Sequence, residues 1–129
     1  MSQNSARDRP IEAYKRIIDG LVADTPSLSA RMVVDVGIFS RSVGAEALNE
    51  LVRSLTSDQR LVLAMMLEHE RKTAIFDVLA ALTWWIDCRG LTFQYGNEPM
   101  PVQLSGEGMH GDYIGRLDDW QWPPETIAP

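Results

Sequence analysis

The sequence contains one cysteine and two histidines in 129 residues, and this shortage limits the sites that it can form. Cys88 has no second cysteine to pair with, so no intramolecular disulfide is expected and a reducing, cytoplasmic location is predicted. A structural zinc site needs four Cys or His ligands, which the chain does not supply. The sequence therefore predicts no disulfide framework and no zinc centre, and the thiol of Cys88 is expected to be buried and inert.

Positive charge and long apolar runs are also scarce. The 18 acidic and 12 basic residues give a net charge of −6, which argues against nucleic-acid phosphate as a partner. A basic protein surface is a better electrostatic match, although mild acidity also serves plain solubility. No run of about twenty apolar residues exists, and Asp77 and Thr83 interrupt the best candidate, so no membrane span is predicted.

One long stretch dominates what is present. Residues 56–90 contain no interior glycine or proline, and residues 61–67 and 74–86 are apolar in nearly every direction around a helix axis. This pattern predicts an interior helix. A single helix from Ser57 to Arg89 would be about 50 Å long, whereas a domain of this size is only about 36 Å across. We therefore expect a bend or short break at the polar run 68–73; the alternative is a continuous helix whose excess length is buried by a second subunit.

Three further helices are predicted before this stretch. Pro10 fits the first turn of a helix that has an apolar face from Ile11 to Val22 and is expected to end near Asp24. Thr25 and Pro26 resemble an N-cap and first turn, so a second helix is expected over 26–40, with a strand at 32–39 as the competing interpretation. A third helix is expected to end near Leu55. Its predicted inward residues are Leu48, Leu51, Val52 and Leu55.

The composition changes after Gly90, which is typical of a helix C-terminus. Residues 91–95 alternate as in a strand, 96–99 form a turn signal, and 100–104 are the expected partner strand. The predicted fold class is mainly α: a four- to five-helix bundle with a small C-terminal β-hairpin or extended clasp. A single domain is expected over 1–129, with a polar tail 1–9, a helical part 10–90, a hairpin or extended clasp 91–123 and a tail 124–129.

Two carboxylates in the long stretch are the first chemical candidates. Glu70 and Asp77 lie two turns apart on one face of a helix, near His69, and such a group can bind a metal or transfer protons. A zinc-protease helix, however, needs a second histidine at the position of Thr73. The pattern favours a structural polar collar over a site.

The sequence His110-Gly-Asp112 is the second candidate. On a loop, His110 and Asp112 can act as a base with its orienting partner or as two metal ligands. The alternative is that Asp112 caps a turn and His110 lies in a surface loop. Residues 106–111 match G-x-G-x-x-G, but no βαβ pattern surrounds them, and residues 112–120 are not expected to form a helix. No metal site and no cofactor are predicted.

The closing segment combines two acids with two large aromatics, Asp118, Asp119, Trp120 and Trp122. If the tryptophans face the helices, they hold the C-terminal segment in place. If they face water, the four residues resemble a binding surface for a basic partner. Trp84 and Trp85 are expected to lie in the core.

Residues 57–82, SDQRLVLAMMLEHERKTAIFDVLAAL, and residues 110–123, HGDYIGRLDDWQWP, together resemble a family of small bacterial proteins of unknown function. The resemblance covers residues 56–123 and rests on a charged patch within a helix and a terminal Trp-x-Trp-Pro. It implies no activity and assigns no functional residue.

Two functional hypotheses follow. The favoured one is a small non-enzymatic interaction or accessory protein, immunity-like, that binds a basic protein partner through the acidic surface formed by Asp118, Asp119, Trp120 and Trp122. The alternative is a small enzyme or metal-binding protein that uses His110 and Asp112 with Glu70 or Asp77. A homodimer is compatible with either.

Overall fold

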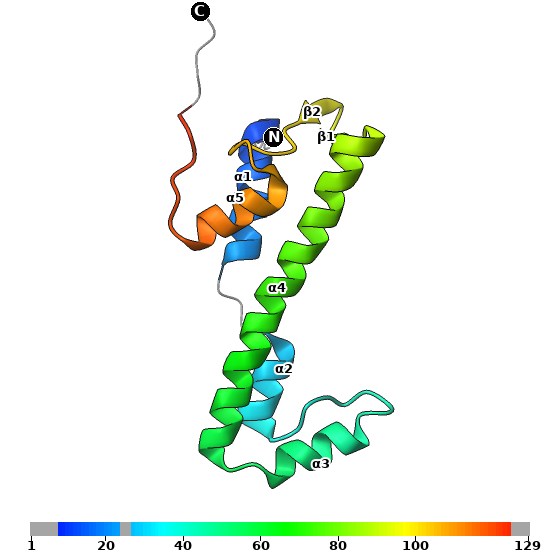
Figure 1. Ribbon diagram of the computed structural model, residues 1–129, viewed down its shortest axis with the longest axis vertical. Coiled ribbons are helices and arrows are strands. Elements are labelled where there is room, and N and C mark those ends of the chain that lie inside the picture. Colours follow the sequence, from blue (N-terminus) through cyan, green and yellow to red (C-terminus); the bar gives the residue numbers. More distant parts are fainter. Residues whose placement is uncertain (1–7, 24–26, 125–129) are drawn as a thin grey trace, which may run out of the picture. The chain divides into compact units, whose positions relative to one another are not determined.

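The computed structural model describes residues 8–23 and 27–124. This part of the chain is mainly helical and carries one antiparallel hairpin, which confirms the predicted fold class. Figure 1 labels the five α-helices and the two strands. In chain order the elements are α1 (Pro10–Val22), α2 (Leu28–Arg31), the π-helix η1 (Met32–Val36), α3 (Glu46–Ser54), α4 (Ser57–Arg89), β1 (Phe93–Tyr95), β2 (Glu98–Met100) and α5 (Gly108–Leu117).

The chain divides into two units. Unit 1 comprises Met1–Ala23 and Phe76–Pro129, and unit 2 comprises Asp24–Ile75. Helix α4 contributes its first part to unit 2 and its second part to unit 1. Whether the units together form the single domain expected from the sequence stays a prediction.

The core of unit 1 is formed where α1 packs against α5. Tyr14 and Ile18 of α1 and Tyr113 of α5 are almost wholly buried, and Leu79 of α4 is buried as well. Helix α1 begins at Pro10, whose missing N–H costs nothing in the first helical turn. The apolar spacing predicted this helix and its buried stripe, although Ile17 of the same stripe is half-exposed.

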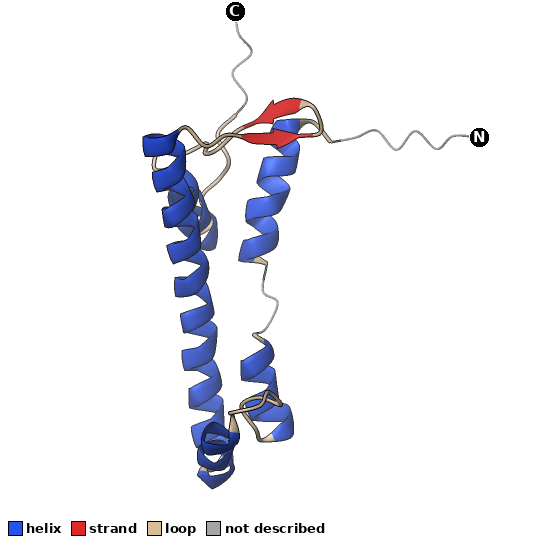
Figure 2. Cartoon of the chain, turned by 90° about the vertical axis from the view of Figure 1, so that its right-hand side faces the viewer, coloured by secondary structure: helices blue, strands red, loops and turns tan. Residues whose placement is uncertain are grey.

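The hairpin packs on α1 and lies across the N-terminal end of that helix in Figure 2. Phe93 is paired with Met100, and Tyr95 with Glu98, around a turn at Gly96 and Asn97. The turn is tighter than predicted, so the second strand begins at Glu98 rather than at Met100. Gly96 has φ of +64°, a conformation that glycine adopts without steric cost.

Unit 2 has a small core of short side chains: Ala30, Val33, Ala45 and Val52. Arg60 at the start of α4 ties this unit together, because its guanidinium donates to the carbonyl oxygens of Val52 (3.0 Å) and Arg53 (3.2 Å) at the end of α3. The guanidinium also lies against Gly37, where an added Cβ would be 3.1 Å from Nη1. Arg60 therefore gives the Arg53 carbonyl a partner at the end of α3, and it is a second donor to the Val52 carbonyl, which also accepts from the N–H of Leu55.

The second predicted helix is confirmed over Leu28–Val36, so the strand alternative for residues 32–39 is wrong. The expected cap at Thr25 and Pro26 lies outside the described residues. Ser27 caps α2 instead, accepting from the N–H of Ala30 at 3.3 Å. In α3 the prediction that Leu48 and Leu51 face inward is wrong, since both are about half exposed, whereas Val52 is buried as predicted.

The predicted break at Glu68–Thr73 is wrong, because α4 continues through these residues. Glutamate, arginine and lysine are good helix formers, and a polar run leaves a helix intact when it reaches solvent. Thr73 also bonds back to the carbonyl oxygen of His69 at 3.2 Å within the helix. Helix α4 ends as predicted at Gly90, where φ is +71° and the N–H of Leu91 reaches the carbonyl oxygen of Trp85.

The expectation that α4 is an interior helix is also wrong. Leu79 is its one buried residue, and seven of its large apolar residues are at least half exposed: Leu61, Val62, Met65, Met66, Val78, Trp84 and Trp85. The physical reason is that each unit contributes too few elements to surround a helix. Cys88, expected to be buried, is exposed. Among the described helices, none combines the length and apolar character that a membrane crossing requires.

Candidate functional site

Asp112, one of the predicted site residues, is fully buried in α5 and has a complete set of donors. Its carboxylate accepts hydrogen bonds from the backbone N–H groups of Leu104 (2.8 Å) and Ser105 (2.9 Å) and from the Tyr14 hydroxyl of α1. Burial raises the pKa of Tyr14 well above its usual value near 10, and the hydrogen bond to Asp112 and its charge act in the same direction. Tyr14 therefore stays a protonated donor, and Asp112 fastens α5 and the preceding loop to α1.

His110, which was predicted to act together with Asp112, faces different residues. Its Nδ1 lies 3.2 Å from the Thr83 hydroxyl of α4, and its ring meets Phe76 edge-on at 5.2 Å. The Thr83 hydroxyl donates to the carbonyl oxygen of Leu79 at 2.9 Å, so a proton on Nδ1 of His110 completes the contact. Asp112, whose donors come from elsewhere, does not orient His110. The predicted base with its orienting partner is not formed.

The other two predicted candidates lie on the surface. Glu70 and Asp77 of α4 are both exposed, Glu70 in unit 2 and Asp77 in unit 1. No group of three or more His, Cys, Asp or Glu residues that would hold a metal ion occurs in residues 8–23 and 27–124. Glu68 of the predicted polar collar has a structural partner, since it accepts from the backbone N–H of Ser27 at the start of α2.

The closing tryptophans pack on helices of unit 1. Trp122 donates from Nε1 to Asp19 of α1 at 3.1 Å and meets the Tyr14 ring edge-on at 6.0 Å. Arg116 of α5 lies 5.2 Å above the Trp122 ring and pairs with Asp19 at 2.7 Å. One aromatic ring and one ion pair thus connect α1, α5 and the closing segment.

Trp120 is fastened to the same helix. Its backbone N–H donates to the carbonyl oxygen of Gly115 at 2.8 Å, and its ring lies so close that a Cβ on Gly115 would be 3.2 Å from it. Both tryptophans are half-buried. Asp118 and Asp119, which connect α5 to Trp120, are exposed. Asp119 has a φ of +62°, and the chain turns there. The segment holds the C-terminal part in place and still presents two carboxylates to solvent.

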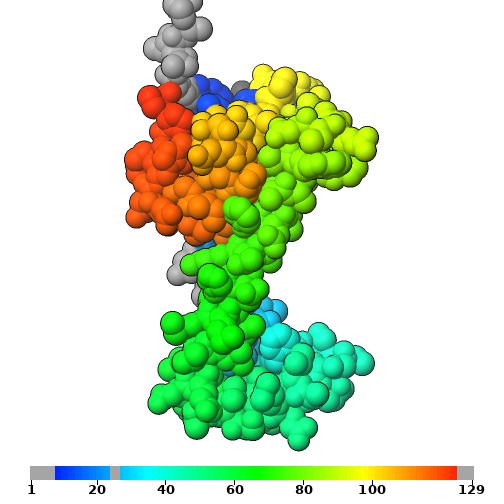
Figure 3. All heavy atoms as spheres, viewed as in Figure 1, coloured from blue at the N-terminus to red at the C-terminus, as the bar shows by residue number. Residues whose placement is uncertain are grey.

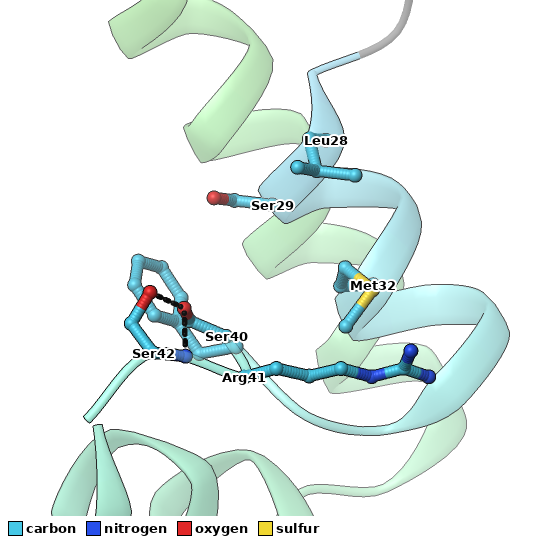
Figure 4. A pocket seen from close by; sticks show the side chains of 7 residues that line it. Leu28, Ser29, Met32, Ser40, Arg41 and Ser42 are labelled. Atoms are coloured by element: carbon cyan, nitrogen blue, oxygen red, sulfur yellow. Dashed lines mark hydrogen bonds between the residues drawn. The ribbon is translucent and has the colours of Figure 1, made fainter. Parts of the chain in front are cut away.

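Unit 2 contains a hollow of about 470 Å³ between α2, η1 and the loop that follows. Figure 4 shows Leu28, Ser29 and Met32 on the helical side and Ser40, Arg41 and Ser42 on the loop side. The two loop serines bond to each other through their hydroxyls at 2.9 Å. Arg41 is the one ionisable residue of the lining, so the hollow has no acid or base for proton transfer.

Four exposed apolar residues of unit 2 follow one another on the first part of α4, a helix that is green in Figure 3. We call this surface the α4 face and define it as Leu61, Val62, Met65 and Met66, which are 52–69% exposed. These residues are spaced as i, i+1, i+4 and i+5, so they form one contiguous patch. A hollow of about 330 Å³ adjoins the patch on the side of Val34, and one of about 370 Å³ adjoins it on the side of Leu55.

Comparison with known families matches residues 7–124 to a family of unknown function (DUF6547). The chain belongs to the DUF6547 family. The resemblance to an uncharacterised family is thus confirmed, over a longer part of the chain than residues 56–123. Comparisons with curated proteins and with solved structures give no match.

The catalytic roles predicted for four residues of this DUF6547 protein stay predictions. The Asp112 carboxylate already accepts hydrogen bonds from groups of the fold, and His110 packs against α4. Glu70 and Asp77 are exposed. The feature that sequence reasoning missed is the α4 face. Its signal was present, because Leu61, Val62, Met65 and Met66 repeat at helical spacing, but periodicity alone does not show which side of a helix is covered.

Proposed function

We propose that this DUF6547 protein is a non-enzymatic accessory protein, immunity-like in kind, that binds another polypeptide through the α4 face. The supporting observation is the exposure of four large apolar side chains in one patch, since monomeric proteins rarely leave such patches uncovered. Two of the four are methionines, whose flexible side chains adapt to a partner surface. Two hollows adjoin the patch, and side chains of a partner can enter them.

The apolar patch is large enough to contribute real affinity. Full burial of a Val, Leu or Met side chain stabilises by roughly 1.5–3 kcal/mol, and about half of that remains available at each position of the α4 face. The four residues thus offer about 3–6 kcal/mol. A micromolar complex needs about 8 kcal/mol, so polar contacts at the rim must supply the rest.

The acidic end of unit 1 is the second contact that we propose. Asp118 and Asp119 are exposed beside the half-buried Trp120 and Trp122, an arrangement suited to a basic protein partner. The tryptophans already serve the fold, so the carboxylates are expected to provide charge, and thereby association rate, more than apolar area. We also propose a cytoplasmic location, which the single cysteine favours.

Photo-crosslinking in the cells of origin tests the proposal. A photoreactive amino acid at position 62 is expected to give an adduct of defined mass, and the same group at position 43, in the exposed loop before α3, is expected to give none. Met66→Glu is expected to abolish the adduct, while Val43→Glu leaves it. Absence of an adduct at position 62 overturns the proposal.

The acidic contact is tested in the same experiment. Asp118→Lys combined with Asp119→Lys is expected to reduce the yield of the adduct, and added salt is expected to reduce it for the native chain. Glu46→Lys with Glu50→Lys is the matched control, because it changes the net charge equally at two exposed positions of α3. Equal reduction by both pairs would show that only net charge matters and would remove the acidic contact from the proposal.

A further inference from the structure

The exposed side of α4 in unit 2 has an ordered charge pattern. Asp58, Val62, Met65, His69 and Lys72 follow each other at intervals of four and three residues, which places them along one side of the helix. All five are exposed. The side chains of Asp58 and Lys72 have no hydrogen bond or ion pair within the part of the chain that the structure describes.

The pattern is symmetric about Met65. Asp58 lies seven residues before it and Lys72 seven residues after it, each about 10 Å away along the helix axis. No charged residue lies between Arg60 and Glu68, so the middle of this side is wholly apolar. Both of those flanking residues are already bonded within unit 2, Arg60 to the end of α3 and Glu68 to Ser27.

We propose that the occupant of the α4 face is a second copy of this chain, paired antiparallel with its two-fold axis at Met65. This arrangement places Asp58 of each copy beside Lys72 of the partner subunit, so two charge pairs close the apolar middle from both ends. A parallel arrangement would place Asp58 against Asp58 and Lys72 against Lys72. The inference rests on the proposed function only for the α4 face, whose partner it names; the contact of Asp118 and Asp119 with a basic partner is a separate part of that proposal.

The relief of unit 2 suits a self-complementary contact. In a two-fold interface the same surface is used by both copies, so a ridge must face a hollow. Val62 and Met66 border the hollow of about 370 Å³ that Asp58 also lines, and Leu61 and Met65 border the hollow of about 330 Å³ beside η1. Side chains of the second α4 can enter both hollows, as ridges enter grooves when helices pack.

Sedimentation equilibrium of the purified full chain over a range of concentrations tests the dimer. The native chain is expected to form a dimer. Met65→Glu is expected to weaken it by more than about a hundredfold, because two glutamates would face each other in an apolar interface. Val43→Glu introduces the same charge at a fully exposed loop position and is expected to leave the dimer unchanged. A native chain that is monomeric at all concentrations overturns the inference.

Charge exchange tests the register. Asp58→Lys and Lys72→Asp are each expected to weaken the dimer roughly threefold to tenfold, since each places like charges together at both ends. The double variant restores opposite charges and is expected to return within about threefold of the native dimer. A double variant at least as weak as the singles overturns the antiparallel register. Circular dichroism of each variant checks that the helices remain formed.

The outcomes separate this inference from the proposed function. A monomeric chain that still gives a heterologous adduct at position 62 overturns the homodimer and supports the proposed function. A monomeric chain that gives no adduct overturns both. A dimer that Met65→Glu does not weaken forms through another surface and overturns the inference.

Discussion

Replacing Asp112 by alanine is expected to destabilise unit 1 strongly. The substitution removes the acceptor of three donors at once: the N–H groups of Leu104 and Ser105, at 2.8 and 2.9 Å, and the Tyr14 hydroxyl. A buried donor without a partner costs about 1–3 kcal/mol. Leu104 and Ser105 are only half-buried, so water relieves part of that cost. We therefore expect unfolding free energy to fall by about 3–5 kcal/mol.

Urea unfolding followed by tryptophan fluorescence measures this loss. All four tryptophans belong to unit 1, so the signal reports the unit that contains Asp112. Asp77→Ala is the matched control, because Asp77 is an exposed aspartate of the same unit and its loss is expected to change stability by less than about 0.5 kcal/mol.

A double-mutant cycle assigns the contribution of the tyrosine. Tyr14→Phe removes one donor and is expected to cost about 1 kcal/mol, while Asp112 keeps its two backbone partners. In the Asp112→Ala background the same change is expected to cost less, because the hydroxyl has already lost its acceptor. If Asp112→Ala costs less than about 1 kcal/mol, the carboxylate is not the structural anchor that we infer, and a role in binding or catalysis becomes open again.

Three further predictions concern pH, the unit 2 core and the closing segment. The pKa of Tyr14 is raised in the folded state, so just above pH 10 only the unfolded chain loses this proton. The free energy of unfolding is therefore expected to fall by about 1.4 kcal/mol for each unit of rising pH. Urea unfolding at alkaline pH measures this slope, and a Tyr14→Phe chain with the same slope would contradict the prediction. Arg60→Ala is expected to lower the free energy of unfolding of unit 2 by about 2 kcal/mol. Circular dichroism measures this loss, because unit 2 has no tryptophan. Arg60→Lys is expected to recover less than half of the lost stability, since one ammonium cannot match both carbonyl contacts. Trp122→Ala is expected to cost about 2–3 kcal/mol in thermal unfolding, below the roughly 3–5 kcal/mol of a fully buried tryptophan, and a loss under 1 kcal/mol would show that the ring does not hold the segment.

Helix α5 shows why part of the candidate site could not be predicted. Three of its ten residues are glycine, which lowers intrinsic helix preference by about 1 kcal/mol each, so residues 112–120 did not read as a helix. The structure supplies a reason for each of them, and at Gly111 a Cβ would lie 2.6 Å from the Cβ of Glu107. At Gly115 the Trp120 ring approaches the backbone closely, and at Gly108 φ is +84° and a Cβ would lie 2.9 Å from Thr83. Because His110 and Asp112 lie on this helix, His110 faces Thr83 and Asp112 accepts from Tyr14.

Local signals in the sequence determined where most elements begin and end. Pro10 in the first turn of α1, Gly90 after α4 and Gly96 in the hairpin turn act through their own backbone preferences, which do not depend on distant residues. The helical period likewise predicted α1 and the buried position of Val52 in α3. The absence of glycine and proline from 57–89 predicts one helix, and only the length argument favoured a break.

Only the tertiary structure decided what each helix covers and what it leaves exposed. A helix that is apolar on all sides is buried only if enough neighbours lie along it, and unit 2 leaves Leu61, Val62, Met65 and Met66 of α4 exposed. The same is true of Asp112, whose carboxylate became structural because the chain returned Tyr14, Leu104 and Ser105 to it from distant positions. Helix formation depends on neighbours in sequence, whereas burial depends on neighbours in space, and the sequence alone does not specify those for this chain.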